Sequence, residues 1–252
     1  MNRMRTQATW DDVPHLTPAQ KDALWAAIPQ HQRDARTKGI PILGSGRVFT
    51  TAEETIICEP FDLPRSFARI TGVDFGIDHP FAAARCAWDR DNDIWYVTGS
   101  YRERDATPPL HAAALRPWGT SVPIAWPHDG LNRDKGSGDQ LAAQYRAHGI
   151  NMLPAHATHQ EGGTGVEAGI MEMIERMQTG RFKVFRGLAD WFEEYRLYHR
   201  KDGLIVKLTD DLISATRYAL MMRRYAEVER AEQRRLRPGG VGGGWGLEGV
   251  LR

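Results

Sequence analysis

Short apolar runs alternate with turn-forming residues between positions 69 and 103. The runs "RITGVDFG", "FAAARCAWD" and "DIWYVTGSYR" are rich in β-branched, aromatic and small apolar residues, and "IDHP" and "RDND" separate them. Asp, Asn, Gly and Pro at such junctions are typical of tight turns. The pattern therefore predicts three consecutive antiparallel strands.

After residue 103 the pattern changes to helical periodicity, interrupted by two further strand candidates, "VPIAWPHD" and "NMLPA". In the third of the predicted helices, Ile170, Met173, Ile174 and Met177 share one face, which is typical of a core-facing stripe. This order predicts an α/β fold in which helices flank a mixed sheet. The expected helices cover residues 109–115, 137–149, 166–180, 188–199 and 209–237.

Composition divides the chain into three regions. Residues 1–68 are rich in turn signals and hold one short predicted helix, Pro18 to Ile28, so we expect a connector or arm. Residues 69–236 carry the periodic pattern and form the expected folded domain. Residues 237–252 include "GGVGGGWGLEG", which predicts a flexible glycine-rich tail.

The overall composition is that of an ordinary soluble protein, with 41% hydrophobic and 26% charged residues and a formal net charge of +1. This charge does not indicate a nucleic-acid or membrane partner. Apolar runs are too short to span a membrane, and the polar N-terminus lacks a signal-peptide core. Cys58 and Cys86 have no metal-binding spacing, so reduced thiols are expected. These features predict a cytoplasmic protein.

Four aspartates stand where predicted strands end or the last helix begins. Asp74 ends the first strand of the meander, Asp129 ends "IAWPHD", and Asp210 and Asp211 begin the last helix. Each alone is well explained as a turn or cap residue. Brought together at one end of a sheet, however, their carboxylates would repel each other without a cation between them.

Hard oxygen ligands in this number favour Mg²⁺ or Mn²⁺, and two such ions are suited to phosphodiester hydrolysis. The chain is therefore predicted to be a metal-dependent nuclease. Between the two adjacent acids, Asp211 is the favoured ligand, because helical spacing places it on the apolar face with Ala215. Asp210 shares a more polar face with Ser214.

Weaker candidates flank these acids. His79 and His128 are candidates to orient ligands or water, although a turn or partly buried role explains them equally well. Arg133 and Lys135, beside glycines, are candidates for phosphate contacts, or form a solvated loop. Asp78, before His-Pro, is typical of a turn.

The motifs "TGVDFGIDHPFA", "PHDGLNRDKGSG" and "DDLISATRYAL", in this order, resemble the C-terminal nuclease domain of the large terminase subunit of tailed bacteriophages. The resemblance covers roughly residues 69–226 and implies a ribonuclease H-like fold related to RuvC resolvases. It also implies that Asp74, Asp129 and an acid of the last helix hold two metal ions. Related sequences often carry an acid where this chain has Ser214, and Asp210 and Asp78 are the candidates to compensate for it.

The same resemblance implies an endodeoxyribonuclease that cuts concatemeric double-stranded DNA in the host cytoplasm. Its implied partners are a terminase motor domain, the portal and the small terminase subunit. The phosphate-binding motif GxxxxGK[ST] of such a motor does not occur in this sequence. Two alternatives remain, namely a Holliday-junction resolvase of the same fold and a non-catalytic module that docks on the portal or small subunit.

Overall fold

The computed structural model describes residues 9–12, 16–28, 37, 46–76, 79–133, 138–201, 204–206 and 209–228. Asp78, Lys135 and the predicted tail lie outside these residues. Within the described ranges, no helix is long and apolar enough to cross a membrane.

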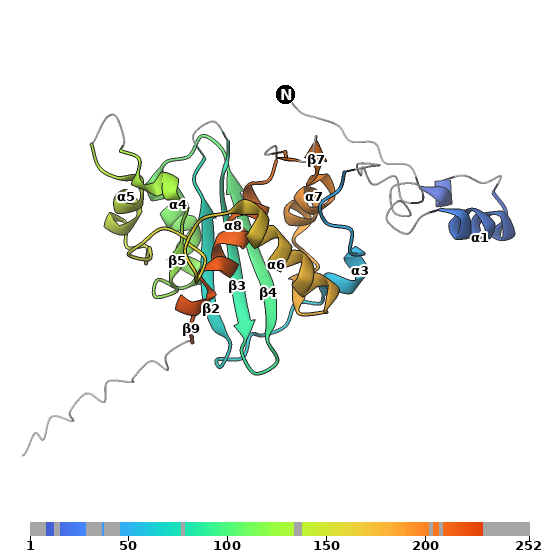
Figure 1. The fold of residues 1–252 in the computed structure, drawn as a ribbon, viewed down its shortest axis with the longest axis horizontal. Coiled ribbons are helices and arrows are strands. Elements are labelled where there is room, and N and C mark those ends of the chain that lie inside the picture. Colours follow the sequence, from blue (N-terminus) through green and yellow to red (C-terminus); the bar gives the residue numbers. More distant parts are fainter. Residues whose placement is uncertain are drawn as a thin grey trace, which may run out of the picture.

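A mixed sheet occupies the centre of the molecule (Figure 1). The predicted meander forms its middle, with β2 antiparallel to β3 and β3 antiparallel to β4. Parallel strands extend both sides, since β5 pairs with β2, and β6 pairs with β4 and β1. The predicted mixed sheet is confirmed. Its strands are β1 (Ile57–Cys58), β2 (Ala68–Asp74), β3 (Phe81–Asp89), β4 (Ile94–Glu103), β5 (Ile124–Ala125), β6 (Phe182–Phe185) and β9 (Glu227–Val228).

The predicted helices are present, several with shifted ends. Thr17 begins the first with a capping box, in which its side chain and that of Gln20 each accept a hydrogen bond from the other's backbone. The longer helices are α1 (Pro18–Ala27), α4 (Pro108–Leu115), α5 (Leu141–Ala147), α6 (Val166–Gln178), α7 (Ala189–Leu197) and α8 (Asp211–Met221). The short elements are α3 (Glu53–Ile56), η1 (Trp10–Asp12), η3 (Arg116–Trp118), η4 (His128–Leu131), η5 (Arg223–Tyr225), β7 (Arg200–Lys201) and β8 (Leu204–Ile205).

Three predictions of secondary structure were wrong in extent. The strand expected to reach Asp129 ends at Ala125, because Pro127 follows closely, and Asp129 lies instead in the 3-10 turn η4. The stretch "NMLPA" contributes only a bridge between Met152 and Ile124. The last helix ends at Met221, after which the chain turns through η5 and pairs with β2 as β9.

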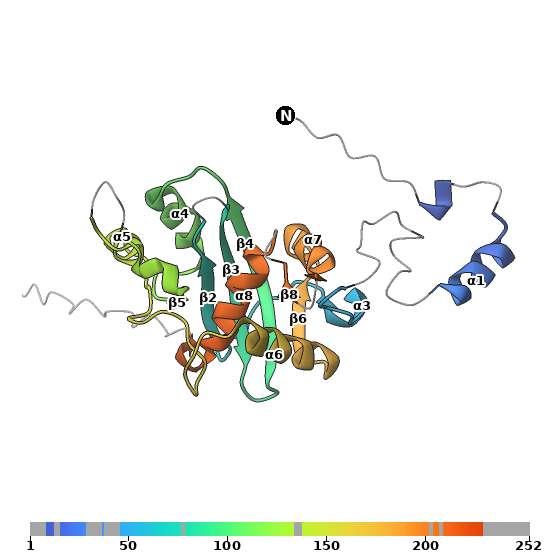
Figure 2. The ribbon, with the colours of Figure 1, turned by 45° about the horizontal axis from the view of Figure 1, so that its top comes forward.

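Helices α8 and α6 lie across one face of the sheet (Figures 1 and 2). The approach of α8 to β2 depends on Gly72, because a Cβ there would lie 1.8 Å from the carbonyl oxygen of Ala215. No side chain fits this space, so the helix backbone rests directly on the strand. Side chains alternate along a strand, and Asp74, two residues after Gly72, therefore faces α8.

The opposite face is covered at the same end of the sheet. Phe81 begins β3, and its ring stacks on His111 of α4 at 4.1 Å between centroids and on Tyr145 of α5 at 5.5 Å. These contacts bury the aromatic side chains on the side of the sheet away from α8. The end of β2 that carries Asp74 is thus held from both faces.

The segment before β2 also contributes to the core. Phe49 is fully buried and stacks on Tyr195 at 5.0 Å and on Tyr198 at 5.4 Å, both from the α7 region. Ile56 is fully buried as well, and β1 adds an edge to the sheet. Helix α1 lies apart from the sheet in both views (Figures 1 and 2). The division between arm and domain at residue 68 stays a prediction.

A carboxylate pocket at the end of the central strands

A small pocket of about 190 Å³ collects acids from three elements. Asp74 comes from the end of β2, Asp129 from η4, and Asp210 and Asp211 from the start of α8. The pocket is also lined by Phe75, His79, Val166, Ser214, Arg217 and Tyr218. The structure therefore brings together the four aspartates that the sequence singled out.

Glycine again permits the placement of Asp129. Strand β5 runs parallel to β2, so η4 follows it at the same end of the sheet as Asp74. A Cβ at Gly130 would lie 2.4 Å from the ring of Trp126 and 2.8 Å from that of Phe75. The indole of Trp126 is buried and donates to the carbonyl of Leu153 at 2.8 Å. The turn that carries Asp129 is thus seated on two fixed aromatic rings.

The acids of the pocket act on one another electrostatically. Burial is the main cause that raises the pKa of Asp74 to about 7; the negative charges of Asp210, Asp211 and Asp129 contribute to the rise, and Arg217 opposes it. Burial also raises the pKa of Asp211, against the opposing influence of His79 and Arg102. The pocket therefore disfavours four simultaneous negative charges in the absence of a cation.

The carboxylate oxygens of the pocket suit a hard divalent cation, although they are not arranged as a complete metal-binding site. Among the described residues, no group of three or more His, Cys, Asp or Glu side chains lies close enough together to hold a metal ion. The four carboxylates nevertheless share one pocket and supply only oxygen ligands, the type that Mg²⁺ and Mn²⁺ prefer. By donor chemistry the residues fit such an ion.

The start of α8 is held by a residue that sequence reasoning missed. Glu194 of α7 is fully buried, and its Oε2 accepts hydrogen bonds from the backbone amides of Leu212 at 2.7 Å and Ile213 at 3.1 Å. Its Oε1 accepts from Nη1 of Arg102 at 2.8 Å. Burial raises the pKa of Glu194 to about 8, although these donors favour its ionised form.

The capping explanation for the two acids of α8 holds only in part. Asp210 occupies the N-cap position, but its side chain makes no capping hydrogen bond. Its Oδ2 accepts a long hydrogen bond, 3.4 Å, from the hydroxyl of Ser214. Asp211, preferred as a ligand because it shares a face with Ala215, is buried in the pocket lining. Both acids line the pocket, so its geometry does not choose between them.

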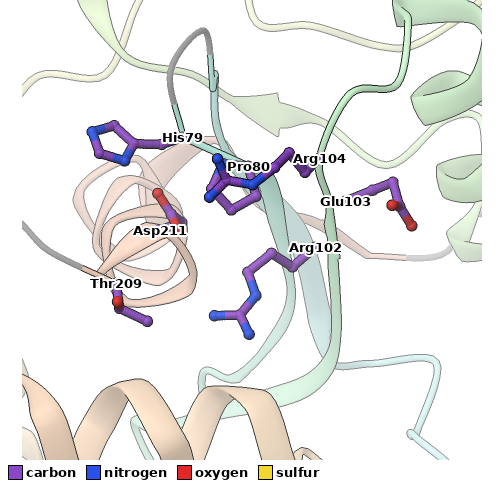
Figure 3. Close-up of a pocket in the computed structure, with 7 residues that line it drawn as sticks. All are labelled: His79, Pro80, Arg102, Glu103, Arg104, Thr209 and Asp211. Carbon is purple, nitrogen blue, oxygen red and sulfur yellow. The ribbon is translucent and has the colours of Figure 1, made fainter. Parts of the chain in front are cut away.

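Of the weaker candidates that the structure describes, His79 alone lines the pocket. It also lines a neighbouring pocket with Arg102, Arg104 and Asp211 (Figure 3). His128 lies beside His156, with 5.0 Å between ring centroids, and Arg133 donates to the carbonyl of Gly138 at 2.9 Å. The roles proposed for these three residues stay predictions, and Asp78 and Lys135 are outside the described chain.

Arg217 is a second residue that the sequence did not single out as functional. It is buried, its guanidinium lies 4.3 Å from the ring centroid of Tyr218, and Nη1 donates to Sδ of Met221 at 3.3 Å. Gly169 of α6 makes room for it, since a Cβ there would lie 2.7 Å from Cγ of Arg217.

For Glu194 the sequence did hold a signal, because this residue falls within the aromatic stripe of Trp191, Tyr195 and Tyr198.

Comparison with known proteins identifies the family to which this chain belongs. The model of a family described as the terminase RNaseH-like domain matches residues 71–223. The chain belongs to this family. It is 46% identical over 220 residues to the large terminase subunit of Salmonella phage P22, and 46% identical over 213 residues to that of Enterobacteria phage LP7. These matches cover 87% and 84% of the chain but only 44% and 45% of the relatives, so the chain spans less than half their length.

Solved structures agree with the terminase family. The nuclease domain of the P22 large terminase has 47% sequence identity and a TM-score of 0.69, covering 73% of this chain and 96% of that domain. The nuclease domain of the bacteriophage SPP1 large terminase with bound Mn has 18% identity and a TM-score of 0.51, covering 69% and 98%. The latter shares the fold. The family resemblance and the ribonuclease H-like architecture predicted from the sequence are both confirmed.

Proposed function

We propose that this terminase domain is a metal-dependent endonuclease that cuts concatemeric double-stranded DNA during phage genome packaging. The observation that carries the proposal is the meeting of four aspartates from β2, η4 and α8 in one pocket. The 47% identity to the P22 large terminase nuclease domain supports it. Asp74, Asp129 and Asp211 are the proposed principal ligands, with Asp210 as the fourth, for two Mg²⁺ or Mn²⁺ ions.

Bound divalent ions would supply Lewis acidity at the scissile phosphodiester. The protein's own contribution is to hold the carboxylates. Asp74 is placed by a strand packed on both faces, and Asp129 by a turn seated on Trp126 and Phe75. His79 and Arg102, beside Asp211, oppose the rise in its pKa that burial causes, and so favour the ionised form needed for metal binding. No covalent enzyme intermediate is required.

The proposed partners follow from the same relatives. Large terminase subunits from phages P22 and LP7 match this chain over less than half their length. We infer that the domain works in the cytoplasm of an infected bacterium with a motor domain, the portal and the small terminase subunit. Because one duplex sequence presents the same phosphates as another, little sequence preference is expected.

The test is a Mn²⁺ titration with supercoiled plasmid DNA. Wild type should nick and linearise the plasmid, and Asp74→Asn and Asp129→Asn should each abolish cutting while leaving the protein folded. Asp62→Asn, which changes an exposed acid outside the pocket lining, is the matched control and should cut normally.

The alternatives give different results in the same assay. Preference for a four-way junction over linear duplex would indicate a resolvase. An intact plasmid at every Mn²⁺ concentration, or equal cutting by the two pocket variants, would refute the nuclease assignment and favour a docking module.

A further inference from the structure

The first turn of α8 is capped by another helix. An Asp at the N-cap position usually accepts a hydrogen bond from an amide two or three residues later. Asp210 has this position and makes no such bond. The amides of Leu212 and Ile213 instead donate to Oε2 of Glu194, at 2.7 and 3.1 Å. A residue eighteen positions earlier in the chain therefore does the capping.

Glu194 is itself fixed from a third element. Arg102 reaches from β4 toward the start of α8, whereas the neighbouring Glu103 points away (Figure 3). Nη1 of Arg102 donates to Oε1 of Glu194 at 2.8 Å, and Nη2 of Arg102 lies 3.9 Å from Oδ1 of Asp190. A buried carboxylate is costly unless it is paired and hydrogen-bonded, and Glu194 has both kinds of partner. These contacts tie β4, α7 and α8 together at the point where Asp210 and Asp211 enter the pocket.

We propose that Glu194 is a positioning residue for the carboxylate pocket. By capping α8 from α7, it fixes the first helical turn and spares the side chains of Asp210 and Asp211 from capping their own helix. Both acids can then line the pocket at the end of β2. This inference rests on the proposed metal-dependent function and assigns Glu194 no contact with substrate.

A purely stabilising role is the competing explanation, and metal affinity separates the two. Loss of a stabilising contact lowers the melting temperature without changing how well the folded protein binds Mn²⁺. Loss of a positioning contact weakens metal binding in the protein that remains folded. Residues that orient metal ligands typically change metal affinity 10–100-fold when mutated.

The chain offers a matched control in a second carboxylate that is bound to α7. Arg196 of α7 donates from Nε and Nη2 to the two carboxylate oxygens of Glu53, at 2.7 and 2.8 Å. Glu53→Gln breaks a paired, partly buried carboxylate of α3 that binds Arg196 of α7. Glu194→Gln removes the corresponding charge from the residue that caps α8.

The experiment measures the Mn²⁺ dissociation constant of the folded proteins by calorimetry, together with the cleavage rate at saturating Mn²⁺. Glu194→Gln should weaken Mn²⁺ binding about tenfold or more, and high Mn²⁺ should restore most of the cleavage rate. Glu53→Gln should melt earlier but bind Mn²⁺ as wild type does. Arg102→Lys, which keeps a cation but loses the planar fork, should weaken binding in the same direction and serves if Glu194→Gln does not fold.

Two results would overturn the inference, and they are distinguishable. Wild-type Mn²⁺ affinity in Glu194→Gln, or in Arg102→Lys where the first variant is unfolded, makes Glu194 merely stabilising and leaves the nuclease proposal intact. A wild-type protein that binds no Mn²⁺ overturns the proposed function, and this inference with it.

Discussion

Gly72 offers the sharpest test of how the pocket is built. A methyl group at this position would lie 1.8 Å from the carbonyl oxygen of Ala215 and 2.8 Å from the amide nitrogen of Ala219. Both are backbone atoms of α8, so no rotamer change can relieve the overlap. An ordinary contact needs roughly 3.5 Å, so Gly72→Ala must push α8 away from β2 by about 1.7 Å or unfold locally.

This displacement has two expected costs. Overpacking that a core cannot absorb costs about 1–3 kcal/mol and sometimes more, and here we expect about 3 kcal/mol or above because only backbone can move. In a chain of this size that corresponds to a melting temperature lower by about 6–12 °C. The shift also moves Asp210 and Asp211 relative to Asp74, and a misplacement of about 1 Å can slow catalysis roughly a hundredfold.

The assay combines thermal unfolding with plasmid cleavage well below the melting temperature. Gly187→Ala is the matched control, because a Cβ at Gly187 meets nothing within 4 Å. That variant should match wild type in both measurements. A Gly72→Ala protein with wild-type melting temperature and cleavage rate would refute the direct backbone packing of α8 on β2.

Two further predictions concern titration and core polarity. The metal-free chain should become less stable as pH rises from about 5 to 8, because the folded pKa of Asp74 is about 7 against an ordinary value of 3.8. Glu194, with a pKa raised to about 8, acts in the same direction. The melting temperature in EDTA should fall as pH rises across this range, and Asp74→Asn should make that fall smaller. An unchanged pH dependence in Asp74→Asn would contradict the assigned burial of Asp74. Separately, Thr216→Val leaves the buried indole N–H of Trp191, which donates to Oγ1 of Thr216 at 2.9 Å, without a partner. Chemical denaturation should show a loss of about 1–3 kcal/mol, and a change below about 0.5 kcal/mol would count against this hydrogen bond.

Local patterns predicted the centre of the fold. The antiparallel strands β2 to β4 are neighbours in the sequence, so turn residues and apolar runs are enough to indicate them. Strand β6 and the two-residue β1 were not predicted. They pair with each other across more than one hundred positions, and short parallel strands carry little pattern of their own. Burial by distant segments, rather than local propensity, makes them strands.

The aspartates of the site could be predicted because each follows a strand pattern or precedes a helix pattern, and such a position can be recognised from the local sequence alone. What the sequence could not show was how α8 begins. Its first turn depends on Glu194, whose position within an aromatic stripe indicates burial but does not name a partner. Arg217 was equally hidden, because its place beside Gly169 arises only from the packing of α6 against α8.

Helix α7 contacts both the segment before β2 and the start of α8, and it does so through neighbouring residues. Tyr195 donates to the carbonyl of Thr51 at 2.7 Å, and the carbonyl of Tyr198 accepts from the amide of Val48 at 3.0 Å. Glu194, one peptide bond from Tyr195, caps α8. A local opening that releases the segment around Phe49 therefore also loosens the helix that holds the cap. We therefore expect the segment before β2 and the start of α8 to open together, although they lie far apart along the chain.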